Sequence, residues 1–191
     1  DQVKIYKFND ETGKITLVDM LRCELESAPR IIKFSPDGRF AYLICELKNY
    51  ISVYSYKDGP RGPVFELVQT ISTLNEYHSK GSAACVLRFS RDWNYVLCSN
   101  AGDNSVGIFK IDRETGMLEK ICILPISGDY PKAADFFPDN RHIMALNHES
   151  NTMTIFRINY EKKYFSLWGK PLKVETPNCV LVSEIEEAPK Q

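Results

Sequence analysis

The strongest constraint on this sequence is an internal repeat. Three segments share one pattern: RIIKFSPDGRFAYLICELKNYISVYSY, CVLRFSRDWNYVLCSNAGDNSVGIFKI and KAADFFPDNRHIMALNHESNTMTIFRI. Each contains a phenylalanine (Phe34, Phe89 or Phe136), an aspartate three residues later and an asparagine fifteen residues later. The phenylalanines are 55 and 47 residues apart, a spacing typical of the blades of a β-propeller and not of a helical solenoid.

Each repeat has the local signals of β-hairpins. Apolar and β-branched residues alternate over short runs, and the turn sequences PDG, RDW and PDN separate these runs. The outer turns NDETGK and DRETGM contain a glycine, which adopts a positive φ without steric cost. We therefore predict an all-β fold, a β-propeller of four-stranded antiparallel blades, with about four blades' worth of a seven-bladed ring present.

The repeat also predicts how the chain divides. We expect one partial propeller over residues 1–191, in which strands at residues 3–6 and 15–18 complete a blade and residues 179–182 begin another. The predicted parts are 1–28 (end of one blade), 29–75, 76–125 and 126–171 (full blades), 172–185 (last inner strand) and 186–191 (tail). A half ring would expose two apolar blade faces. We therefore expect the chain to be part of a longer protein, or to pair with a missing N-terminal half or another copy to close the ring.

Charge and hydropathy limit the classes of partner. The chain has 24 basic and 25 acidic residues and no basic run, which argues against nucleic acid or an anionic membrane as partner. No apolar run approaches the roughly 18–20 residues that span a bilayer. The cysteines form no CxxC pair and no Cys/His cluster, so we predict reduced, mostly buried thiols and a cytoplasmic location. They are Cys23, Cys45, Cys85, Cys98, Cys122 and Cys179.

The order of several unlike motifs resembles the C-terminal half of the seven-bladed lactonase family. The motifs are APRIIKFSPDGRFAYLICEL, SAACVLRFSRDWNYVLCSNAGDNSVGIFKIDRETGML, SGDYPKAADFFPDNRHIMALNHESNTMTIFRI and TPNCV, which together cover nearly the whole chain. This family includes the propeller-type 6-phosphogluconolactonases and the fungal carboxy-muconate lactonizing enzymes. The resemblance implies a lactone hydrolase that acts on an anionic sugar lactone such as 6-phosphogluconolactone and needs no metal or organic cofactor.

Two other functions remain open, because one propeller can carry several chemistries. The chain is alternatively a non-catalytic propeller that binds an anionic metabolite or a protein. The third possibility is that the chain is part of a muconate-lactonizing cyclase, an isomerase.

The repeat places pairs of residues on one rim of the ring. The innermost strand of a blade starts at that rim and the second strand returns to it, so the residue four before each repeat phenylalanine meets the residue twelve after it. These pairs are Arg30 and Glu46, Cys85 and Ala101, and Lys132 and His148. Asn178 takes the position of Arg30 in the last inner strand.

Arg30 and Glu46 are the predicted catalytic pair. A guanidinium binds a carboxylate or phosphate through two parallel hydrogen bonds, and a carboxylate beside it serves as base or acid. By resemblance, the two match an arginine and a glutamate at the active site of the muconate-cyclizing branch. In lactone hydrolysis Glu46 would activate water or shuttle the proton, and Arg30 would bind an anion or stabilise the oxyanion. The alternative is an ion pair that only ties two strands together.

The predicted substrate-binding residues are Lys132, His148, His78 and Asn178. A cation beside an imidazole suits phosphate binding or proton transfer near neutral pH. His78 lies in a long connection that the resemblance places on the same rim. A surface role is the alternative for each of these histidines, and we expect His142, after a turn at the opposite rim, to be structural.

One departure from the family pattern weakens the catalytic reading. The family usually has Ser-Asn-Arg-Gly where this chain has Ser99-Asn100-Ala101-Gly102, and the loss of a charged hydrogen bond costs about 2–3 kcal/mol.

The repeated aspartates Asp37, Asp92 and Asp139 open turns, so we interpret them as turn caps and not as metal ligands. The repeated asparagines are interpreted as residues that fix loops.

Overall fold

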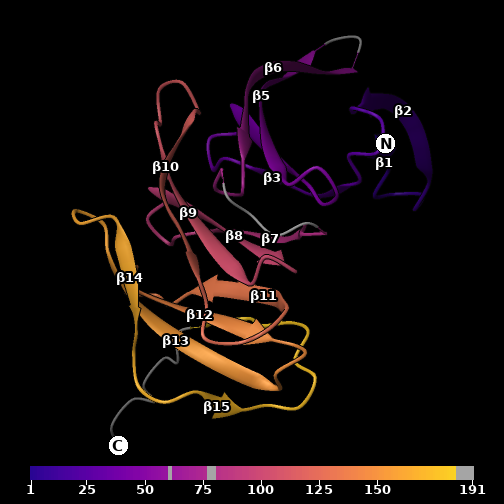
Figure 1. The fold of residues 1–191 in the computed structure, drawn as a ribbon. Helices are drawn as coiled ribbons and strands as arrows, with labels where there is room; N and C mark the ends of the chain where they lie inside the picture. The colour runs from indigo at the N-terminus through magenta and orange to yellow at the C-terminus, as the bar shows by residue number, and fades with distance from the viewer. Residues whose placement is uncertain (60–61, 77–80, 184–191) are drawn as a thin grey trace, which may run out of the picture.

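The computed structural model describes residues 1–59, 62–76 and 81–183, and these ranges contain strands and turns but no helix. Figure 1 shows the strands gathered into sheets that follow one another in an arc, with the N-terminal sheet at one end. All strand pairs within the sheets are antiparallel. In the described ranges no helix is long and apolar enough to cross a membrane. The predicted all-β propeller, about half a ring, is confirmed.

Three sheets are complete blades whose strands follow in chain order, and β1 (Gln2–Phe8) with β2 (Ile15–Arg22) forms a separate two-stranded sheet. The first blade contains β3 (Pro29–Phe34), β4 (Phe40–Cys45), β5 (Tyr50–Gly59) and β6 (Gly62–Ser72). The second contains β7 (Ala83–Phe89), β8 (Tyr95–Ala101), β9 (Ser105–Ile111) and β10 (Leu118–Pro125). The third contains β11 (Pro131–Phe136), β12 (His142–Asn147), β13 (Thr152–Asn159) and β14 (Tyr164–Leu167).

The end of the third blade differs from the prediction. A short strand, β15 (Leu172–Lys173), pairs with the beginning of β13, so it continues the outermost strand after the interruption that follows β14. The boundary predicted at residue 172 is therefore wrong, since Leu172 and Lys173 belong to the blade before them. Residues 179–182 form no strand in the structure, because a strand needs a neighbour for its ladder hydrogen bonds and the described chain supplies none there.

Each blade packs face to face on the next. In β4, Tyr42 and Ile44 join the core shared with the second blade, whereas Leu43 and Cys45 pack toward β1 and β2. Strand β4 is buried along its whole length because both of its faces are covered. A second core of the same kind joins the second and third blades. Packing between blades therefore fixes how the strand ends sit relative to one another on each rim.

The sheet of β1 and β2 carries apolar side chains that the described residues leave exposed. The large ones include Tyr6, Phe8, Ile15, Leu17, Val18 and Met20. Exposed large apolar side chains in such number on one small sheet are typical of an interface. In a closed ring a neighbouring blade would cover it, and pairing with another chain or half stays a prediction.

The six cysteines are free, and four of them, Cys45, Cys85, Cys98 and Cys122, are buried. The prediction of mostly buried thiols is confirmed. Burial raises the pKa of Cys98 to about 12 and that of Cys122 to about 11. Both thiols therefore stay protonated at pH 8, and the thiolate is the form that reacts.

A thiol-labelling experiment tests this burial. We expect Cys98 and Cys122 in the native protein to react with an aromatic disulfide reagent at pH 8 at least about 100-fold more slowly than in concentrated urea. Mass spectrometry of digested samples gives the rate for each residue, and the urea sample is the internal control. Equal rates for Cys98 in the two samples would contradict the buried position.

Candidate functional site

A β-bulge at the same point of each blade sets the direction of the rim residues. In the first blade Pro29 pairs with Cys45 and Ile31 with Ile44, so Arg30 is an extra residue without an opposite partner. The same register shift leaves Cys85 extra in β7 and Lys132 extra in β11. Bulges commonly re-aim side chains beside functional sites. The backbone therefore has the same bulge at these three positions, which are equivalent in the repeat.

Arg30 and Glu46 meet as the sequence predicts. Arg30 Nη1 lies 2.6 Å from Glu46 Oε2, and Arg30 Nε donates a 2.9 Å hydrogen bond to the carbonyl of Cys85 in the next blade. The side chains keep 42% and 29% of their exposure, so both remain open to a ligand. The guanidinium is thus held from two sides while part of its edge still faces solvent.

The charges on this rim follow from the same contacts. Partial burial disfavours the charged form of Arg30, but the hydrogen bond and the negative charge of Glu46 outweigh it and raise the pKa of the guanidinium. Burial raises the pKa of the Cys85 thiol, although the nearby charge of Arg30 acts in the opposite direction. Cys85 is therefore a neutral thiol at pH 7, in agreement with the prediction of mostly buried thiols, and the neutral form is not the nucleophile.

Lys132 and His148 occupy the equivalent positions but do not contact each other. Lys132 Nζ lies 5.7 Å from the centre of the Tyr130 ring. His148 Nδ1 is 3.4 Å from the carbonyl of Pro177, and its Nε2 is 4.0 Å from Glu149 Oε1. Among the described residues, no hydrogen bond or ion pair joins Lys132 to His148. The two blades share backbone geometry on this rim, but only the first forms the predicted side-chain pair.

Asn178 has the local backbone of the predicted position. The tripeptides 28–30, 130–132 and 176–178 each consist of a residue with positive φ, a proline and then Arg30, Lys132 or Asn178. The three φ values are 51°, 60° and 40°. Asn178 Nδ2 donates to the carbonyl of Thr176 at 3.2 Å and is exposed. His78 lies outside the described residues.

The repeated asparagines fix the loops that lead to this rim. All three have a left-handed backbone: Asn49 (φ 53°), Asn104 (φ 54°) and Asn151 (φ 53°). Asn104 Oδ1 accepts from the Tyr130 backbone N–H at 2.8 Å, and Asn151 Oδ1 accepts from that of Thr176 at 2.8 Å. Each bond joins one blade to the start of the next, so the interpretation as loop-fixing residues is confirmed.

The aspartates at the opposite rim cap their turns. Asp37 Oδ1 accepts from Ser35 Oγ at 2.6 Å and from the Arg39 backbone N–H at 3.1 Å. Asp92 accepts equivalent bonds, and Asp139 binds His142 Nδ1 at 2.5 Å. Within the described ranges, no group of three or more His, Cys, Asp or Glu residues is arranged to hold a metal ion. These hydrogen bonds confirm the turn-cap interpretation, and His142 lies directly after its turn on the opposite rim, as predicted.

Sequence reasoning missed Tyr130. Its ring lies beside Lys132, and its hydroxyl is close enough to Arg30 to affect the guanidinium electrostatically. The signal was available, since Tyr130 precedes a proline and a cation as Ala28 does in the first blade. An aromatic ring at this point adds a wall to the site between the charged positions.

Comparison with known proteins identifies the family. Residues 1–182 match the profile of the family described as "Lactonase, 7-bladed beta-propeller". The chain belongs to this family. It is 32% identical over 181 residues to an uncharacterized protein of Lactococcus lactis subsp. cremoris, covering 95% of this chain and 52% of that protein. It is 24% identical over 177 residues to the 6-phosphogluconolactonase of Bacillus subtilis, covering 93% and 50% of the two chains.

A solved structure agrees with the fold. The periplasmic gluconolactonase of Pseudomonas aeruginosa superimposes with a TM-score of 0.84 at 24% identity, over 94% of this chain and 50% of that one. The chain thus spans about half the length of the relatives it matches. At this identity the structural likeness supports the propeller architecture alone.

Proposed function

We propose that the protein containing this chain is a lactone hydrolase that acts on a sugar lactone, such as 6-phosphogluconolactone, in carbohydrate metabolism. Membership of the lactonase family and a relative named 6-phosphogluconolactonase support the reaction class. The observation that carries the proposal is the 2.6 Å pair of Arg30 and Glu46, built on a β-bulge and open to solvent. The free thiols support a cytoplasmic location as part of the same proposal.

The pair supplies the groups that lactone hydrolysis needs. Glu46 holds a water molecule and accepts its proton as the water oxygen attacks the carbonyl carbon of the lactone. Arg30 stabilises the negative charge that develops on the carbonyl oxygen. The tetrahedral intermediate then breaks the bond between the carbonyl carbon and the ring oxygen, and Glu46 returns the proton to that leaving oxygen. The product is the open hydroxy acid.

The neighbouring positions suit the rest of the substrate. Lys132 contributes a second cation on this rim, close enough to affect the Cys85 thiol electrostatically. We assign Lys132, His148, Asn178 and His78 to binding of the phosphate and hydroxyl groups of the sugar. The proposed ligand is therefore anionic, and the mechanism uses side chains alone.

The direct test is an assay of the full-length protein on freshly prepared 6-phosphogluconolactone. Acid production in a lightly buffered solution is followed against the spontaneous rate, with gluconolactone as the substrate that lacks the phosphate. We expect acceleration that is saturable and stronger for the phosphorylated lactone. A rate equal to the spontaneous one at micromolar protein would refute the hydrolase.

Substitution Arg30→Lys tests the role of the guanidinium. Lysine keeps the charge but loses the fork that reaches both Glu46 and the Cys85 carbonyl. Because one charged hydrogen bond is worth about 1.5–3 kcal/mol, we expect kcat/KM to fall about 10- to 100-fold. Arg22→Lys, at an exposed residue of β2, is the matched control and should leave kcat/KM unchanged. An unaltered kcat/KM in Arg30→Lys would remove Arg30 from the mechanism.

A non-catalytic binding protein is the second candidate, and the second blade favours it. Ala101 is fully buried and Cys85 is a neutral thiol, so this blade contributes no side-chain charge at its pair of rim positions. Calorimetric titration with 6-phosphogluconate separates the two functions. Binding by a protein that does not accelerate hydrolysis would support the binding protein.

A further inference from the structure

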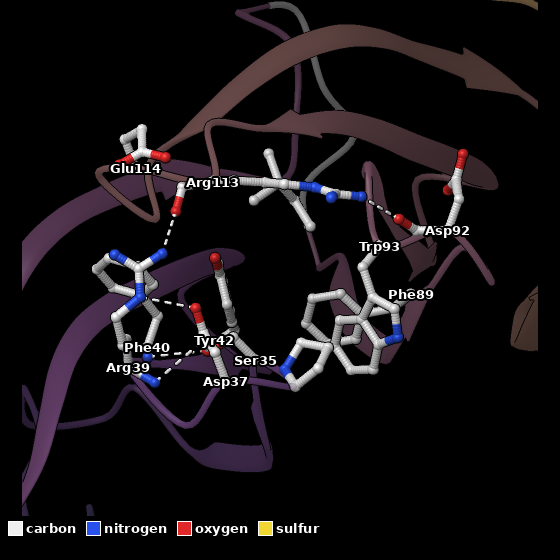
Figure 2. A pocket seen from close by; sticks show the side chains of 12 residues that line it. Ser35, Asp37, Arg39, Phe40, Tyr42, Phe89, Asp92, Trp93, Arg113 and Glu114 are labelled. Carbon is white, nitrogen blue, oxygen red and sulfur yellow. Dashed lines mark hydrogen bonds and ion pairs between the residues drawn. The ribbon is translucent and has the colours of Figure 1, made fainter.

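A hollow of about 430 Å³ opens between the first two blades, on the rim opposite Glu46. Strand β4 runs from Phe40 in this hollow to Cys45 beside Glu46, so the two places lie at opposite ends of one strand. Figure 2 shows Phe89 and Trp93 together on one side, Phe40 beside Arg39 on the other, and Tyr42 between them, with the charged residues Arg39, Glu114, Arg113 and Asp92 around these rings. We propose that this hollow binds an uncharged small molecule with a hydroxyl-bearing aromatic ring. The proposal is independent of the lactonase site.

The next interface between blades has different side chains at two of the positions that line this hollow. By position in the repeat, Phe40 corresponds to Tyr95, and Arg113 corresponds to Tyr160. Tyr160 stacks on Tyr95 with ring centres 3.8 Å apart, and its hydroxyl donates to the carbonyl of Asn140 at 2.6 Å. Arg113 brings no ring, and its guanidinium donates to the carbonyl of Asp92 instead (Figure 2). The ring stack that Tyr160 forms on Tyr95 therefore has no counterpart on Phe40, and Phe40 and Arg113 both line the hollow.

A second substitution removes the bridge that closes the neighbouring turns. Between the second and third blades, Asn140 Oδ1 accepts a 2.7 Å hydrogen bond from the backbone N–H of Arg91. Between the first and second blades, the equivalent residues are Trp93 and Pro36. Proline has no N–H and tryptophan has no side-chain acceptor, so this bridge cannot form. Both residues line the hollow.

Trp93 adopts a backbone conformation that bulky residues avoid. Its φ is 55°, whereas the equivalent turn positions hold Gly38 (φ 70°) and Asn140 (φ 54°), which tolerate the left-handed region better. Strain of this kind concentrates at ligand sites. The indole stacks on Phe89 with ring centres 4.4 Å apart at 28°. In the part of the chain that the structure describes, the Trp93 indole N–H has no hydrogen-bond acceptor, so a ligand oxygen can accept from it.

The charged groups at the opening favour an uncharged ligand. Arg39 Nε lies 2.6 Å from Asp37 Oδ2, and Arg39 Nη2 donates to the carbonyl of Arg113 at 2.8 Å. The carboxylate of Asp37 neutralises the charge of the Arg39 guanidinium, and the two contacts fix its position before any ligand binds. Glu114 adds an acceptor at the opening, so donors and acceptors are both available to hydroxyl groups. The aromatic side chains and a volume within the usual 300–1,000 Å³ range suit one or two rings.

The test uses the full-length protein and the nuclear magnetic resonance of its tryptophan indole N–H groups. Trp93→Phe assigns the Trp93 signal, and Trp168 serves as an internal reference. We expect resorcinol to shift the Trp93 signal saturably in the millimolar range and to leave Trp168 unmoved. Cyclohexane-1,3-diol, which lacks the aromatic ring, and benzoate, which is charged, should bind at least about tenfold more weakly.

Substitution Arg113→Tyr installs a ring that can stack on Phe40 as Tyr160 stacks on Tyr95, and it should abolish the resorcinol shift while the thermal midpoint is kept. Asp58→Tyr, at the equivalent position of the first blade, is the matched control and should bind resorcinol normally. Trp93→Asn introduces the residue that Asn140 provides elsewhere, and ligand-observed saturation transfer should then detect no binding. The proposal is overturned by an unsaturable or absent Trp93 shift, by equal binding of cyclohexane-1,3-diol or benzoate, or by binding retained in folded Arg113→Tyr or Trp93→Asn.

Discussion

Substitution Glu46→Gln is expected to lower kcat/KM for lactone hydrolysis by about 100- to 10,000-fold, the range that general acid–base groups contribute. Glutamine keeps the size of glutamate and still accepts a hydrogen bond from Arg30 Nη1, which now lies 2.6 Å from Glu46 Oε2. It cannot take a proton from water, so the loss should appear in kcat while KM changes little. The measurement is a full set of initial rates on 6-phosphogluconolactone, corrected for spontaneous hydrolysis.

Glu66→Gln is the matched control, because Glu66 is an exposed carboxylate on the outer strand β6. It should retain full activity, and circular dichroism should give the same spectrum for both variants. If Glu46→Gln hydrolyses the lactone within a factor of two of the unaltered protein, the pair of Arg30 and Glu46 is an ion pair that ties two strands together. Binding of 6-phosphogluconate by that variant would then test the non-catalytic alternative.

The contact between Arg30 and Glu46 was predictable because the repeat preserves the number of residues between equivalent positions of each blade. The β-bulge adds one residue at the same place in β3, β7 and β11, so positions four before and twelve after each phenylalanine stay equivalent. Backbone hydrogen bonds repeat as well, since Glu46 donates to Ala28 as His148 does to Tyr130. Sequence spacing therefore placed the backbone correctly in each case.

Side-chain contacts on the rim were less predictable, because they depend on rotamers and on neighbours outside the repeat. Lys132 lies near the Tyr130 ring, and His148 lies near the carbonyl of Pro177. Two long polar side chains on one rim have several partners available, and the spacing does not select among them. The repeat therefore predicts where Lys132 and His148 lie on the rim, but it does not predict whether their side chains contact each other.

Departures from the repeat were the features that sequence reasoning undervalued. RDW was interpreted only as a turn, and the structure does place it in one, with Trp93 strained and stacked on Phe89. A repeat assigns the same role to Gly38, Trp93 and Asn140, yet their side chains have no chemistry in common. Trp93 lines the hollow between the first two blades, and this consequence of the difference becomes visible only when equivalent interfaces are compared in three dimensions.

Substitution Phe109→Ala is expected to cost about 3–5 kcal/mol of unfolding free energy. Phe109 is fully buried in β9, within the core that the first and second blades share. Its ring is closely surrounded, because a side chain on Gly107 would lie 3.1 Å from it. Removing the ring loses its burial and leaves a cavity that two rigid sheets cannot close. Since domains are stable by only about 5–15 kcal/mol, the effect should be large.

Urea unfolding of the full-length protein, followed by circular dichroism, measures this loss as a lower transition midpoint. Leu67→Ala is the matched control, because Leu67 is 60% exposed on β6 and should change the unfolding free energy by less than about 0.5 kcal/mol. Phe109→Leu should fall between the two, since leucine fills part of the space. A midpoint for Phe109→Ala equal to that of Leu67→Ala would mean that the two blades do not share the core in which Phe109 lies, and the placement of both rims would then need revision.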